Sequence, residues 1–131
     1  MAPSAGAGRA ALRPNIVVIM TDDQDDTGSI STMPMVNQLL AQQGITFTNS
    51  FVDFSLCCPS RASFLTGQSA HNHGILGNGP PDGGYAKFAL REGNSLGAWL
   101  QDAGYNTGLV GKVMNGYGKG GGRGPYNAGV D

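Results

Sequence analysis

The sequence predicts an α/β fold in which helices cover a largely parallel sheet. Short apolar, β-branched runs alternate with segments of helical periodicity, in the order strand, helix, strand, helix, helix, strand. The first run, NIVVIM, contains five consecutive apolar residues, which is typical of a central strand covered on both faces. The chain has 131 residues, the length of one domain, and it shows no internal repeat. We therefore expect one layered domain.

The first half of the chain contains two predicted strands and one predicted helix. Residues 1–14 are expected to be a disordered lead, because they are rich in small residues and have no periodicity. Residues 15–20 (NIVVIM) form the predicted central strand, and a polar loop follows. Residues 33–44 have apolar side chains at helical spacing and end at a glycine, which predicts a short amphipathic helix. Residues 45–52 (ITFTNSFV) alternate and are β-branched, which predicts a second strand.

The second half is predicted to contain two helices and one strand. A helix is expected from Pro59 to Gly67, because proline lacks the N–H that a first helical turn leaves unpaired, and glycine is a common stop. Residues 68–84 are rich in glycine, proline and asparagine and are predicted to be turns. Residues 94–104 predict a helix capped by its first asparagine or by the serine after it. Residues 105–112 (YNTGLVGK) predict the last strand.

Composition excludes several classes of partner. The formal net charge is -1 and only 13% of the residues are charged, so there is no basic stripe and we expect no nucleic-acid partner. The longest apolar run, residues 16–20, is too short to span a bilayer, and no signal peptide is visible, so we expect no membrane partner. Two cysteines are too few for a disulfide scaffold, which leaves the localisation unknown.

The two cysteines, Cys57 and Cys58, are adjacent and would lie at the N-terminus of the first helix of the second half. A disulfide between them would be strained, because adjacent Cα atoms are about 3.8 Å apart and ordinary disulfides need about 4.4 Å or more. No CxxC redox motif or zinc-binding pattern is present. Two interpretations remain open. The pair is either two small buried apolar residues, or it supplies a cysteine-derived nucleophile that meets a sulfate or phosphate ester at the positive end of the helix, near Arg61.

Asp22 and Asp23 directly follow the first predicted strand. The carboxyl ends of parallel strands are where α/β folds place their sites, and carboxylate oxygens suit Ca²⁺ or Mg²⁺. An EF-hand loop does not fit, because counting from Asp23 puts Pro34 where that loop requires glutamate. Judged by spacing alone, a solvated turn or a helix cap also remains open.

Three further residues are candidates for a site. Lys112 ends the last predicted strand and can reach the same edge of the sheet, with an ordinary surface lysine as the alternative. His71 and His73 lie in a predicted turn and are either acid/base groups or exposed imidazoles. Residues 116–121 match G-x-G-x-x-G, but neither a helix nor a later acidic residue fits the pattern, so no dinucleotide site is expected.

Three motifs occur in one order along the chain. Residues 57–67 (CCPSRASFLTG) match C-x-P-S-R-x-x-x-L-T-G, and residues 104–112 (GYNTGLVGK) contain G-Y-x-T followed by G-K. Residues 15–24 (NIVVIMTDDQ) add a strand with two aspartates. With these motifs the sequence resembles the sulfatase family. Together with HNHG, the first motif resembles most the branch of N-acetylglucosamine-6-sulfatases and heparan-type sulfatases.

The resemblance implies an alkaline-phosphatase-like sandwich and an enzyme that hydrolyses sulfate esters. Cys57 would be oxidised to formylglycine by a formylglycine-generating enzyme, because only the first cysteine places proline two and arginine four residues onward. The formylglycine hydrate would attack sulfur and later expel sulfate. Asp22 and Asp23, with the converted Cys57, would bind a divalent cation, usually Ca²⁺, with Mg²⁺ as the alternative. Arg61 would hold the hydrate, and Lys112 would bind the sulfate group of a sulfated sugar or aryl sulfate.

The sequence departs from the family pattern in two places. Many sulfatases carry a histidine two or three residues after the G-K lysine, whereas Met114 and Asn115 stand there, so the helper base is unassigned. Asn115 is expected to donate to sulfate, and His71 or His73 is expected to take the acid/base role. Family members also draw metal ligands from far downstream. Residues 15–131 are therefore expected to be the N-terminal part of a catalytic domain, inactive alone.

Two alternative functions remain open at this point. One is a phosphonate monoester or phosphodiester hydrolase of the same superfamily, which can carry the same cysteine motif. The other is a catalytically inactive binding module. Family members are often exported or lysosomal, but no targeting segment is visible in this chain.

Overall fold

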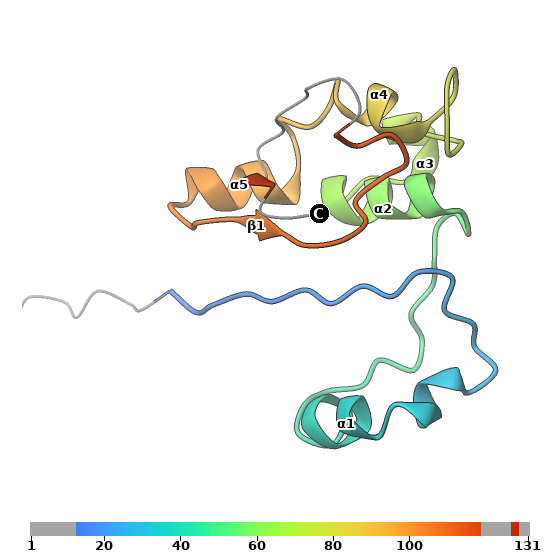
Figure 1. Ribbon diagram of the computed structural model, residues 1–131, viewed down its shortest axis with the longest axis vertical. Coiled ribbons are helices and arrows are strands. Elements are labelled where there is room, and N and C mark those ends of the chain that lie inside the picture. The colour runs from blue at the N-terminus through green and yellow to red at the C-terminus, as the bar shows by residue number, and fades with distance from the viewer. Residues whose placement is uncertain (1–12, 119–126, 129–131) are drawn as a thin grey trace, which may run out of the picture.

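The computed structural model describes residues 13–118 and 127–128, and Figure 1 shows two parts of different character. Residues 13–56 form an arm (the N-terminal arm) in which no residue is buried. The described residues from 57 onward form a compact part that contains four helices. The expected disordered lead falls almost entirely on residues 1–12, which lie outside the described residues.

The N-terminal arm contains the predicted amphipathic helix in a shorter form. A 3₁₀ turn, η1 (Ser29–Thr32), precedes α1 (Pro34–Val36), and a π-type turn, η2 (Asn37–Ala41), continues it. The helix is therefore confirmed within its predicted range, but three turn types replace one regular helix. Its apolar face is not covered by the described residues, since Met35 is 58% exposed and Leu40 54%.

The two strands predicted in the arm are wrong. Residues 15–20 and 45–52 run without a strand partner among the described residues, and none of them is buried. In residues 15–20 the exposure still alternates, from 80% at Val17 to 52% at Val18 and 76% at Ile19, so the backbone is extended. Apolar, β-branched composition favours an extended conformation, but a ladder also requires a neighbouring strand, which the local sequence does not supply.

Helix α2 (Cys57–Thr66) confirms the helix predicted from Pro59 to Gly67. It begins two residues before Pro59, whose missing N–H falls in the first turn, where no intrahelical acceptor exists. It ends at Gly67, whose φ of 64° lies in the left-handed region that glycine adopts without steric cost. The start of the helix thus carries both cysteines, as the sequence predicts.

The turn prediction for residues 68–84 is wrong in part. Helix α3 (Ala70–His73) forms within it and packs against α2, and α4 (Gly84–Phe88) begins at its last residue. Only the stretch between them is irregular, with an isolated bridge from Gly77 to Gly83. The glycines and prolines of this segment lie at the ends of short helices. In the sequence the same composition is indistinguishable from that of a continuous loop.

The last helix and strand confirm the sequence pattern in outline. Helix α5 (Leu96–Asp102) begins after Ser95, one of the two predicted cap positions. Strand β1 (Gly108–Leu109) pairs in parallel with β2 (Asn127–Ala128), so the parallel orientation is confirmed but the predicted strand shrinks to two residues. The described part of the chain is mostly helical and carries little sheet. It contains no helix of the length and apolarity that crossing a bilayer requires.

The core of the compact part joins α2 to α4 and to the chain after β1. Tyr85 of α4 meets Tyr117 edge to face, with ring centroids 4.8 Å apart. Burial and the hydrogen bond to Glu92 raise the pKa of Tyr85 to about 12, so its hydroxyl is neutral and donates. This core fixes residues 113–114 against the first turns of α2. Its buried members are Cys58, Ala62, Ile75, Tyr85, Phe88, Val113 and Met114.

Candidate active site

The N-terminus of α2 lies at the centre of the site. Cys57 is half-buried and Cys58 is fully buried, and both are free thiols. The residue before the helix, Leu56, makes no side-chain cap. The peptide N–H of Cys58 instead donates to Oδ1 of Asn78, at 2.9 Å, which satisfies one amide of the first turn. Pro59 has no N–H and Ser60 donates to the main-chain oxygen of Leu56, so the amides that follow Cys57 in the first turn are all accounted for.

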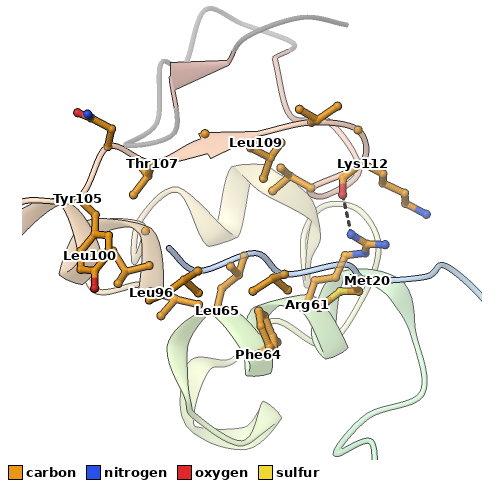
Figure 2. A pocket seen from close by; sticks show the side chains of 18 of the residues that line it. Met20, Arg61, Phe64, Leu65, Leu96, Leu100, Tyr105, Thr107, Leu109 and Lys112 are labelled. Atoms are coloured by element: carbon orange, nitrogen blue, oxygen red, sulfur yellow. Dashed lines mark hydrogen bonds between the residues drawn. The ribbon is translucent and has the colours of Figure 1, made fainter. Parts of the chain in front are cut away.

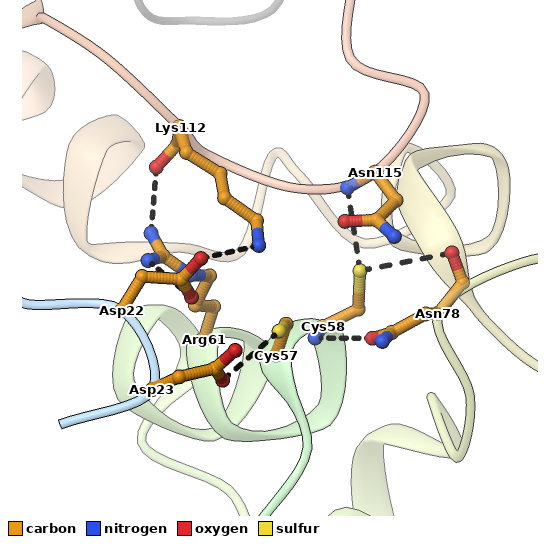
Figure 3. Close-up of polar contacts among 8 residues, drawn as sticks. All are labelled: Asp22, Asp23, Cys57, Cys58, Arg61, Asn78, Lys112 and Asn115. Atoms are coloured by element: carbon orange, nitrogen blue, oxygen red, sulfur yellow. Dashed lines mark hydrogen bonds and ion pairs between the residues drawn. The ribbon is translucent and has the colours of Figure 1, made fainter. Parts of the chain in front are cut away.

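Asp22 and Asp23 approach the same helix terminus from the N-terminal arm (Figure 3). Cys57 Sγ lies 3.8 Å from Oδ1 of Asp23. Asp23 has a positive φ of 50°, which turns the chain where the extended residues 15–20 end. Its neighbour Asp22 faces Lys112 instead, with 2.6 Å between Oδ2 and Nζ. The two adjacent carboxylates thus serve different partners.

Arg61 connects the arm, the helix and the chain after β1. Its guanidinium is buried and donates from Nη1 to the main-chain oxygen of Lys112, at 2.6 Å, and from Nη2 to Oδ1 of Asp22, at 3.3 Å. The hydrogen bond from Lys112, with Arg61 beside it, holds the pKa of Asp22 below its usual range. Asp22 in turn raises the pKa of Lys112, and Cys57 adds to that effect. At neutral pH the Lys112 ammonium and the Asp22 carboxylate therefore stay charged.

Three side chains could hold a metal ion. One ligand atom each from Asp22, Asp23 and Cys57 lies within 4.8 Å of the others. The two carboxylates fit Ca²⁺ or Mg²⁺, which prefer oxygen ligands, but a thiol does not fit these hard cations. An oxygen-bearing form of Cys57 would make all three donors hard. The two carboxylates therefore fit a hard divalent cation, and the thiol of Cys57 adds no suitable donor.

The two histidines are not brought to this group by any hydrogen bond or ion pair among the described residues. His71 is exposed on α3. His73 is fully buried; Nδ1 accepts the N–H of Ile75 at 3.0 Å, and Nε2 lies 3.0 Å from Oγ of Ser63. Because Nδ1 accepts, the proton sits on Nε2 and the ring is neutral. Burial accordingly lowers the pKa of His73. His73 thus has a structural setting at the junction of α2 and α3.

This setting predicts a pH dependence of stability. A neutral His73 is favoured in the folded state, so the unfolded chain binds the proton first as pH falls below about 6.5. We expect the free energy of unfolding to decrease from that pH downward and the slope to flatten in His73→Gln. The measurement is urea unfolding between pH 7 and pH 5. His71→Gln is the matched control and should keep the slope; a slope lost with His71 instead would contradict the assignment.

Asn115 and Met114, which stand where many sulfatases have a histidine, hold different positions. Met114 is buried in the core. The side chain of Asn115 is exposed, and its peptide N–H donates to Sγ of Cys58, at 3.3 Å. Sequence reasoning missed this contact and also missed Asn78. Nothing in the sequence marks Asn78, because an asparagine between two glycines is ordinary turn composition.

A groove of about 440 Å³ runs behind the polar group, between residues 15–20, α2, α5 and β1. Figure 2 shows Arg61 and Lys112 at one end of it and Tyr105 at the other. Most of its lining is apolar, including Phe64 of α2 and Leu109 of β1. The stem of Arg61 lies along this wall, so its guanidinium reaches the carboxylate of Asp22 from the buried side.

The comparisons with known proteins identify a family. The sequence profile described as Sulfatase matches residues 14–129. The extracellular sulfatase SULF-1 homolog of Drosophila melanogaster is 41% identical over 80% of this chain, and the N-acetylglucosamine-6-sulfatase of Homo sapiens is 38% identical over 86%. An arylsulfatase of Volvox carteri is 40% identical over 85%.

These alignments cover only part of each relative. The matched region spans 10%, 21% and 18% of the fly, human and Volvox proteins. No solved structure gives a significant match. The profile nevertheless covers most of the residues described above, including both aspartates, both cysteines and Lys112. On these grounds the chain belongs to the sulfatase family.

Proposed function

We propose that this chain carries part of the active site of an enzyme that hydrolyses sulfate esters, with Cys57 converted to formylglycine. One observation carries the proposal: three distant segments bring two carboxylates and two cations to the N-terminus of α2, around Cys57 (Figure 3). The names of the relatives support sulfated sugars or aryl sulfates as substrates. A formylglycine-generating enzyme is the partner that the conversion requires.

The proposed roles follow from charge and position. Asp22, Asp23 and the converted Cys57 would hold Ca²⁺, or Mg²⁺, which when bound supplies positive charge next to the sulfate oxygens. Converted Cys57 supplies a hydrated aldehyde as the nucleophile. Arg61, whose guanidinium is buried, orients the hydrated aldehyde. Lys112 binds a sulfate oxygen by exchanging its hydrogen bond to Asp22 for one to the substrate.

Asn115 and the two histidines complete the proposed set. The exposed amide of Asn115 follows Lys112 closely in sequence and is proposed to donate to the sulfate group. His71 is exposed and free to exchange a proton with water, which suits an acid/base group. His73 would first have to give up its hydrogen bond to Ser63 or Ile75. Of the two, the greater exposure of His71 supports His71.

The family also suggests the larger architecture. We propose that residues 15–131 are the N-terminal part of a catalytic domain with an alkaline-phosphatase-like sandwich. The parallel pairing of β1 with β2 supports this arrangement.

The alternative is hydrolysis of phosphonate monoesters or phosphodiesters. Arg61 and Lys112 suit phosphate as well as sulfate, because both groups present anionic oxygens to the same donors. Comparing the turnover of matched sulfate and phosphate esters separates the two functions. A complete protein with converted Cys57 that cleaves neither class would favour the third possibility, an inactive binding module.

The conversion itself is the direct test of the proposal. In a host that contains the formylglycine-generating enzyme, mass spectrometry of the peptide with Cys57 is expected to show an aldehyde there, while Cys58 remains alkylatable. In a host without that enzyme both residues should alkylate after unfolding. An aldehyde at Cys58, or none at either residue, would contradict the proposed mechanism.

A further inference from the structure

Three chain segments meet at Cys58. Its peptide N–H donates to Oδ1 of Asn78 at 2.9 Å, and its fully buried Sγ accepts the N–H of Asn115 at 3.3 Å. Its S–H group points to the main-chain oxygen of Asn78, 3.9 Å away. Buried polar groups are costly to leave unpaired, so these contacts specify where both loops lie relative to α2. We call Cys58, Asn78 and the N–H of Asn115 the Cys58 clamp.

Asn78 replaces the missing cap of α2. A side chain at the position before a helix usually accepts an amide of the first turn, but Leu56 has no acceptor to offer. Asn78 supplies the acceptor from a loop twenty positions further along the chain. The first turn, including Cys57, is therefore ordered by a residue outside the helix.

The clamp also holds the segment that carries Lys112. At one end of this segment the main-chain oxygen of Lys112 accepts from Arg61, and at the other the N–H of Asn115 is held by Cys58. Val113, between these attachments, is buried in the core together with its neighbour Met114. Both attachments come from α2, the helix that begins with Cys57.

We propose that Cys58 and Asn78 are positioning residues that hold Cys57 and Lys112 at a fixed separation. The inference rests on the proposed roles of those two residues in sulfate ester hydrolysis. Neither Cys58 nor Asn78 reaches the reacting atoms. Cys58 determines where the Lys112 segment lies, and Asn78 determines whether the turn with Cys57 is formed. The second cysteine is thus part of the construction of the site as well as of its core.

The test measures how well Lys112 attracts an anion to Cys57, without reference to activity. The 131-residue chain is produced without the converting enzyme, so that Cys57 remains a thiol. Iodoacetate and iodoacetamide both alkylate its sulfur with loss of iodide, but only iodoacetate is an anion. The ratio of the two rates therefore reports the cations beside the thiol, and fragment masses assign the label to Cys57.

Cys58→Ala and Asn78→Ala are expected to lower the ratio about fourfold, the effect of one unit charge roughly 5 Å away in water. Lys112→Met should produce the same fall by removing the charge itself. Cys58→Ser keeps an acceptor and should restore the ratio. Ile75→Ala is the matched control, because it removes an equally buried side chain of the same core. It should weaken the fold but leave the ratio unchanged under conditions where circular dichroism shows a folded chain.

Two results would overturn the inference. One is an unchanged ratio in both clamp variants while Lys112→Met lowers it. The other is an equal fall in Ile75→Ala, which would mean that any loss of core packing has this effect. If Cys58→Ala does not fold, Asn78→Ala decides the matter, since Asn78 is not buried in the core. If Cys57 is not converted, the proposed function is refuted but this inference is not, because the alkylation ratio does not depend on the conversion.

Discussion

Replacing Cys57 by alanine is expected to abolish sulfate ester cleavage by the complete enzyme that contains this chain in its converted form. The loss should be on the order of a thousandfold or more, because the variant has no atom that can become the nucleophile. The first turn of α2 should remain, since the amide of Cys58 donates to Asn78 and not to the side chain of Cys57. The measurement is the turnover of an aryl sulfate alongside circular dichroism.

Ser50→Ala serves as the control for this prediction, because Ser50 is exposed on the N-terminal arm and lies outside the site. It should retain the full rate. An active Cys57→Ala variant would show that the nucleophile lies elsewhere. The structure would then leave the carboxylates and cations as a binding group without a reacting atom.

Asp22→Asn and Asp23→Asn are each expected to weaken divalent cation binding by about tenfold to a hundredfold and to lower turnover with it. Each change removes a negative charge from the three-residue donor set. Asp22→Asn should have an additional effect, because its carboxylate also pairs with Lys112 and Arg61. The measurement starts from converted protein whose metal has been removed with a chelator. This protein is titrated with Ca²⁺ in a calorimeter and then assayed for activity.

The same polar loop provides a matched control. Asp26→Asn removes an exposed carboxylate that is not part of the donor set and should leave both binding and turnover unchanged. Cation binding that survives in both the Asp22 and Asp23 variants would show that the metal lies elsewhere. Equal losses in the Asp26 variant would point to a general effect of loop charge.

Local signals in the sequence determined α2 well and the sheet poorly. Pro59 and Gly67 mark the helix by their own backbone properties, and both ends lie within two residues of the prediction. The extended run at residues 15–20 has a suitable composition, but a ladder depends on partners that no local pattern names. Pairing is a long-range property, so the local pattern at residues 105–112 could not predict that β1 pairs over only two residues.

The candidate site shows the same division between local and long-range information. The motifs identified Asp22, Cys57 and Lys112 separately, and the structure brings them together over 90 residues of sequence. The hydrogen bonds of Arg61 to the main-chain oxygen of Lys112 and to the carboxylate of Asp22 could not be predicted, because they arise from packing. Asn78 was missed for the same reason, since its role depends on which helix its loop meets.

The cap that Asn78 provides links the order of α2 to the closing of a loop. The contact spans 20 residues, so forming it costs chain entropy on the order of 2 to 3 kcal/mol, which a local cap would avoid. Whenever this loop opens, the amide of Cys58 loses its acceptor and the first turn can fray. Cys57 therefore lies on a turn whose order depends on this distant contact, and its exposure to other molecules is expected to follow the lifetime of that contact.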